Sequence, residues 1–176
     1  MNKIKTSFSS VMLVWGWSAV ISYFVFGYLE DIKAFGYWWG QLKHYTGILI
    51  PIFVLLYTAY AIYEHRLSLK DQINRTVIIL WSLVILFMIL VNVFLFHSHG
   101  SVPFETQQPV FMVLTALVSF ATGRLKKIGL MMVGSVVFLL LGIWAFQVDF
   151  TTQKLLHSIG WFVTFVIPGH IGKRSV

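Results

Sequence analysis

The most constraining feature of this chain is its longest uncharged stretch, which lies between Arg75 and Glu105 and is mostly apolar. The hydrocarbon core of a bilayer needs about 20 consecutive apolar residues per helix, so this stretch is long enough to cross a membrane. Of the whole chain, 58% of the residues are hydrophobic and only 11% are charged, which is too little polar surface to cover a soluble globule of this size. The sequence therefore predicts an integral membrane protein.

The apolar runs are long and unbroken, whereas the strands of a membrane barrel alternate between apolar and polar residues. Only helices and closed barrels satisfy their backbone groups in lipid, so the predicted fold is an all-α, polytopic membrane bundle. Six spans are expected, at residues 11–29, 45–63, 76–96, 109–123, 128–146 and 155–171. The fourth and sixth are short and could be re-entrant, which leaves four or five spans as an alternative.

The positions of the basic residues favour six spans, because cytoplasmic loops of membrane proteins collect lysine and arginine. With six spans and the N-terminus inside, ten of the thirteen basic residues lie on the cytoplasmic side, and the C-terminus lies there as well. The ten are Lys3, Lys5, Arg66, Lys70, Arg75, Arg124, Lys126, Lys127, Lys173 and Arg174. Without the fourth span, the connection that contains Lys126 and Lys127 would move to the outside, against this bias.

Composition also limits the functions of the chain. The sequence has no cysteine, which excludes disulfides, thiolate metal sites and cysteine nucleophiles. Its basic residues are spread over short loops, so no nucleic-acid partner is expected. The loops are too short to form another domain, and residues 1–176 are expected to form a single transmembrane domain.

Glycines at positions 16, 129, 134 and 142 are expected to let helices approach closely. The lipid bilayer is the expected partner, and a bacterial inner membrane the expected location.

Histidine is the residue type that remains for chemistry, because no charged side chain lies at mid-depth in any predicted span. The expected topology places several histidines and carboxylates at the outer surface: His44, His97, His99, His157, Glu105 and Asp149. Neutral imidazole suits zinc and copper, and such a site needs three or four ligands. His97 and His99 are therefore candidate metal ligands, and interfacial anchoring is the alternative.

A second hypothesis starts from HSIGWFVTFVIPGH, residues 157–170, which has a histidine at each end. The two histidines are thirteen residues apart, about 20 Å along an ideal helix, which would place one imidazole near each membrane face. The segment resembles the histidine, aromatic, histidine helix of six-span membrane cytochromes b of the ferric-reductase-like kind. LKHYTGIL, residues 42–49, resembles the basic-and-glycine opening of a partner helix in such proteins.

This resemblance implies b-type haem ligation by His157 and His170, one ligand for each of two stacked haems, with His44 and His65 as the candidates on the partner helix, and electron transfer to or from a quinone, a flavin or a partner subunit. His44 and His65 are twenty-one residues apart, about 31 Å, so the two pairs differ in height. A mixed pair that joins His157 to another outer histidine would hold one haem. Pro168 either kinks the last helix or, with the glycine after it, ends it.

Two other function classes stay open: a small channel or permease, for a metal ion for example, and a non-catalytic accessory subunit of a membrane complex. A homo-oligomer is compatible with each of them. Aromatic residues of the first span could line a quinone or lipid pocket, although packing alone also explains them. These residues are Trp15, Trp17, Tyr23 and Phe24.

Overall fold

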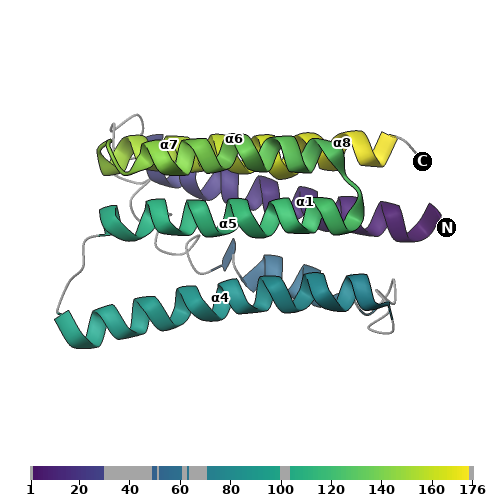
Figure 1. The fold of residues 1–176 in the computed structure, drawn as a ribbon, viewed down its shortest axis with the longest axis horizontal. Helices are drawn as coiled ribbons and strands as arrows, with labels where there is room; N and C mark the ends of the chain where they lie inside the picture. The colour runs from purple at the N-terminus through teal and green to yellow at the C-terminus, as the bar shows by residue number, and fades with distance from the viewer. Residues whose placement is uncertain are drawn as a thin grey trace.

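The computed structural model describes residues 2–29, 49–50, 52–60, 63, 71–99 and 104–174 (Figure 1). All regular elements in these ranges are helices, which confirms the predicted all-α class for this part of the chain. In chain order they are α1 (Asn2–Val20), the π-helix η1 (Ile21–Tyr28), α4 (Gln72–His99), α5 (Phe104–Lys126), α6 (Gly129–Ala145), α7 (Phe150–Trp161), the π-helix η2 (Phe162–Val166) and α8 (Ile167–Arg174). Residues 52–60 are also helical.

The helices lie side by side in one bundle (Figure 1). α1 with η1, α4 and α6 run in one direction, and α5 runs in the other. α7, η2 and α8 form one continuous helix that runs parallel to α5. Both chain termini, the start of α4 and the turn between α5 and α6 therefore lie at the same end of the bundle, which we call the basic end because Arg124, Lys126 and Lys127 belong to it.

Four helices in the described part of the chain are long and apolar enough to cross a membrane. They cover Phe8–Tyr28, Gln72–Val91, Thr106–Lys126 and Phe150–Gly172. α6 is also apolar but shorter, at 17 residues. The predicted second span, 45–63, is described only in part.

The expectation that the fourth and sixth spans are short is wrong, because both belong to the four long helices. The last helix starts at Phe150, where the Asp149 side chain caps it by accepting a hydrogen bond from the Thr152 amide at 3.0 Å. Polar residues near the starts of these helices, such as Gln108 and Gln153, are buried between helices. Hydropathy along the sequence counts such residues against a span, although they never face lipid.

Pro168 does not end the last helix, which continues to Arg174. Proline has no amide hydrogen, so the carbonyl four residues before it, on Thr164, loses its usual donor. The backbone widens into η2 just before this point, and the Ile167 amide bonds to the Phe162 carbonyl, five residues back. The π-helix thus accommodates the proline without breaking the helix.

Close packing at glycines is confirmed at three of the four predicted positions. A Cβ atom added to Gly134 would lie 2.5 Å from a backbone oxygen of η2, and one added to Gly16 would lie 2.9 Å from a side chain of η2. At Gly142 the nearest atom, on α5, is 3.1 Å away. Gly129 has nothing within 4 Å, so the prediction is wrong there. η2 is therefore held tightly against both α1 and α6.

Candidate functional site

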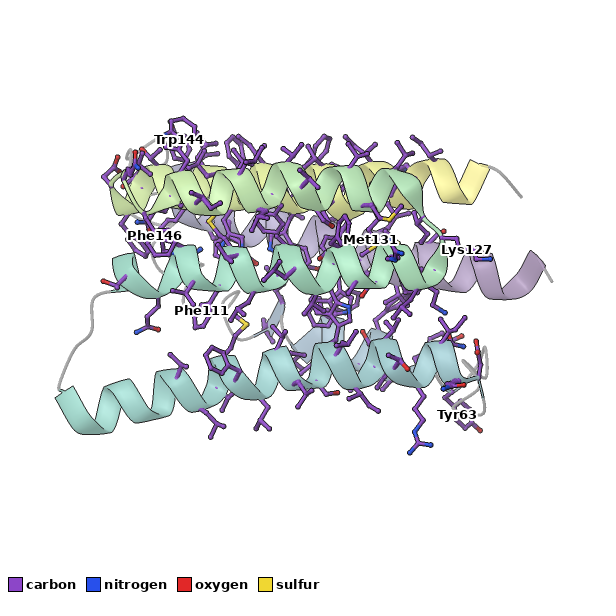
Figure 2. The ribbon with its side chains drawn as sticks, in the orientation of Figure 1. Tyr63, Phe111, Lys127, Met131, Trp144 and Phe146 are labelled. Carbon is purple, nitrogen blue, oxygen red and sulfur yellow. The ribbon has the colours of Figure 1, made fainter. Side chains whose placement is uncertain are left out.

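A cavity of about 280 Å³ lies in the half of the bundle nearest the basic end. α1, α4, α5, α6, α7, η2 and the helical residues 52–60 all contribute to its wall. Most of the lining side chains are apolar, among them Met12, Leu55, Val77, Ile78, Ile85 and Met131. Figure 2 shows Met131 at the start of α6. A mainly apolar cavity between the helices of a bundle is the usual form of a ligand site.

Three tryptophans from separate helices line this cavity: Trp15 of α1, Trp81 of α4 and Trp161 of α7. The Trp15 indole donates a hydrogen bond to the Thr58 hydroxyl at 2.9 Å, and the Trp81 indole donates to the Thr122 hydroxyl at 3.2 Å. Two of the three polar indole groups are thereby satisfied within the protein, so that the rings offer mainly apolar surface to a ligand.

Phe165 of η2 joins two of these tryptophans into one aromatic wall. Its ring stacks on Trp161 at 4.5 Å between centroids and meets Trp81 edge-on at 5.8 Å. The Trp161 indole nitrogen is buried and finds no hydrogen-bond partner among the described residues. An unsatisfied buried donor costs about 1–3 kcal/mol, a cost that a water molecule or a ligand acceptor would remove.

The polar part of the cavity wall lies at the basic end, where Asn74 and Lys126 line it. The Lys126 ammonium donates a hydrogen bond to the Asn74 side-chain oxygen and lies 5.3 Å from the centre of the Phe8 ring. Asn74 is buried, with 4% of its surface exposed. The partners of this cation are therefore a neutral amide and an aromatic face.

A separate polar cluster surrounds His157 and joins three helices. The His157 ring is 2% exposed and stacks on the Tyr23 ring of η1 with 3.9 Å between centroids. The Gln108 side chain of α5 is hydrogen-bonded both to Nδ1 of His157 and to Tyr23. These bonds fix the imidazole inside the bundle, and the predicted place of His157 at the outer surface is wrong. The helix begins at Phe150, so His157 lies about 10 Å along it.

His170 lies near the other end of the same helix and is exposed. Its Nε2 atom accepts a hydrogen bond from the Trp17 indole at 3.3 Å. One imidazole is thus inside the bundle and the other on its surface, and η2 with Pro168 does not bring them to the same face.

The side chains of the other four predicted ligands are not described in the structure. His44 and His65 lie outside the described residues, and His97 and His99 belong to α4 but their side chains are not described. In the described part of the chain, no group of three or more histidine, cysteine, aspartate or glutamate residues could hold a metal ion. Haem ligation at His157 and metal binding at His97 and His99 stay predictions.

Of the four aromatic residues of the first span that could line a pocket, only Trp15 lines this cavity. Trp17 instead contacts His170, and Tyr23 contacts His157. The other two tryptophans of the wall come from helices distant in the sequence and were not predicted. No family model, curated protein or solved structure matches the chain. A function must therefore be argued from the chemistry of the site.

Proposed function

We propose that this protein crosses the membrane six times, with both termini in the cytoplasm, and binds a lipophilic molecule in the cavity described above. The direction of the helices supports six crossings. η1 ends at the opposite end of the bundle from the start of α4, so the chain must cross back between them. α6 likewise connects the end of α5 to the start of α7, which lie at opposite ends.

The distribution of charge supports the orientation. Eight basic residues of the described ranges belong to the basic end, and Lys154 belongs to the opposite one. The eight are Lys3, Lys5, Arg75, Arg124, Lys126, Lys127, Lys173 and Arg174. Under the positive-inside bias, the basic end faces the cytoplasm.

The observation that carries the binding proposal is the apolar cavity with tryptophans in its wall and a cation at its basic end. An apolar cavity stays dry and takes up apolar ligands, since water finds few hydrogen-bond partners in it. Each buried CH₂ group contributes about 0.8 kcal/mol relative to water, although a ligand that arrives from lipid gains less. The apolar part of the ligand would lie against Trp15, Trp81 and Trp161, and its polar part near Lys126.

Electron transfer is our second candidate function, and Trp161 is the residue that favours it. Trp161 lines the cavity and also stacks on the ring of His157, with 6.5 Å between centroids and 18° between planes. A quinone in the cavity would then lie one aromatic ring away from His157, whose Nδ1 atom is hydrogen-bonded to the Gln108 side chain. His157 would supply one ligand to a b-type haem, and His44, His97 or His99 the second.

A titration of tryptophan fluorescence tests the binding proposal. Three of the seven tryptophans line the cavity, so a short-chain ubiquinone or a brominated dodecyl alcohol should quench the emission of protein in nanodiscs and reach saturation. Ser82 lines the cavity, whereas the next residue, Leu83, does not and is 57% exposed. We expect Ser82→Phe to weaken binding at least tenfold and Leu83→Phe to leave it unchanged. Equal binding by the two variants, or quenching that never saturates, would contradict the proposal.

A reduced-minus-oxidised visible spectrum tests the second candidate. Haem ligation predicts a Soret band in protein purified from cells supplied with haem, and this band should disappear in His157→Leu. It should persist in Trp17→Phe, which changes a surface contact of His170. Saturable binding of a lipophile without any haem band would leave the first proposal and remove the second. Strict co-purification with one partner, with neither signal, would favour an accessory subunit.

A further inference from the structure

We propose that the lipophile carries an anionic head group, a phosphate or a carboxylate, which pairs with the Lys126 ammonium. This inference rests on the proposed function and names the class of its ligand. It depends on three features of the basic end of the cavity: the neutral partners of Lys126, the position of Lys126 relative to the membrane, and the contrast with Lys127.

Among the described residues, the partners of Lys126 leave its positive charge without a directly bound anion. Its ammonium contacts Asn74 and the Phe8 ring, both of which also line the cavity. Asp71 is the carboxylate that acts on Lys126 through space, but it lies on the exposed surface and accepts a hydrogen bond from the Ile73 amide at 3.1 Å. A half-buried cation gains more from a charge-assisted hydrogen bond to an anion than from a neutral acceptor.

The position of Lys126 suits a head group rather than a tail. It is the last residue of α5, at the level where the basic end would meet the lipid head groups. From this level the cavity wall follows α4 from Asn74 to Ile85, about 16 Å along the helix axis. An acyl chain anchored at Lys126 would extend along this wall, past Trp81, toward the middle of the membrane.

Lys127 is the matched control. It follows Lys126 directly and carries the same charge, but it is exposed and does not line the cavity. Figure 2 shows it at the turn between α5 and α6. A general attraction of anions to the basic end would depend on both lysines, whereas a built site depends on Lys126 alone.

The experiment compares dodecyl phosphate, dodecanoate and dodecanol by competition with the fluorescence probe in nanodiscs of neutral lipid. For the wild-type chain we expect at least one of the two anions to bind tenfold or more tightly than the alcohol, the range for a hydrogen bond between charged groups. Lys126→Gln should remove this preference and Lys127→Gln should keep it. A preference for phosphate would point to a phospholipid, and one for carboxylate to a fatty acid.

A second variant addresses the possibility that Lys126→Gln disturbs folding. Asn74→Asp keeps the lysine and gives it an internal anion, so it should weaken the binding of the anions and spare that of the alcohol. The inference is overturned if the wild type binds anions and alcohol equally, or if Lys126→Gln keeps the preference; in both cases the proposed function stands. If none of the three amphiphiles binds, the proposed function itself fails.

Discussion

The substitution Gly134→Ala tests the packing that holds η2 in place. Gly134 lies in α6 with its backbone directly against η2. An alanine Cβ there would lie 2.5 Å from the Val163 carbonyl oxygen and 2.8 Å from the Thr164 Cα. Both are backbone atoms, so no side chain can rotate away, and α6 and η2 would have to separate.

The expected loss follows from two opposing contributions. Alanine in place of glycine inside a helix is favourable by about 1 kcal/mol. Overpacking in a closely packed core costs about 1–3 kcal/mol, and backbone contacts below 3 Å place this site near the upper value. The net loss is about 1–2 kcal/mol. For a chain of this length, a loss of this size lowers the melting temperature by about 2–8 °C.

Thermal unfolding in detergent, followed by tryptophan fluorescence, measures this loss. Gly129→Ala is the matched control, because the same change in the same helix meets no atom within 4 Å. We expect the control to melt at or slightly above the wild-type temperature. If Gly134→Ala melts as high as Gly129→Ala, α6 and η2 are not in the contact described here, and the reasoning is refuted.

Three further predictions concern single residues. Asp149→Ala should destabilise the protein by about 1 kcal/mol through loss of the helix cap. The hydrogen bonds from Thr152 hold the pKa of the Asp149 carboxyl below its ordinary value of 3.8. Its contribution is therefore present above about pH 4 and is lost as the pH falls through the lower folded-state pKa, so the difference in stability from wild type should be smaller at pH 3 than at pH 7. Lys127→Gly should raise stability by about 1 kcal/mol, because Lys127 has a φ of 56° at the end of α5, where glycine is favoured. An unchanged denaturation midpoint would contradict this prediction. His157→Phe keeps the aromatic stack on Tyr23 but removes the partner of Gln108, so it should lower stability by about 1–3 kcal/mol, and thermal unfolding equal to wild type would show that this buried hydrogen bond is absent.

The fold class could be predicted because helices that cross a membrane need long apolar runs, and such runs are visible in the sequence. The lengths of two spans could not, since their polar residues face other helices. Gln108 and His157 bind each other across the bundle, and hydropathy along one helix cannot reveal a partner on another. Asp149 was the available signal for the true start of the last helix, because aspartate is a favoured N-cap residue.

The end of α5, at the turn to α6, could not be recognised in the sequence. The Ile128 amide bonds to the Gly123 carbonyl at 2.8 Å and the Lys127 amide to the Arg124 carbonyl at 3.2 Å, which is a Schellman motif. Its left-handed position holds a lysine instead of the usual glycine, so this turn could not be predicted from residue type.

The candidate site was harder to predict than the fold. Histidine was the residue type on which the sequence-based hypotheses depended, but the cavity is lined mainly by apolar side chains, three of them tryptophans. Trp15, Trp81 and Trp161 meet only after three helices pack together. Lys126 was interpreted only as a topology signal, because nothing in the sequence places its ammonium beside Asn74.

The most direct test of the central claim is to map the two ends of the bundle relative to the membrane. Because the chain has no cysteine, Lys127→Cys and Gln147→Cys each introduce a single label site, at the basic end and at the opposite end. With a membrane-impermeant maleimide on intact bacterial cells that express the chain, Gln147→Cys should react, and Lys127→Cys only after permeabilisation. Reaction of Lys127→Cys in intact cells would contradict a cytoplasmic basic end and, with it, the proposed orientation of the protein in the membrane.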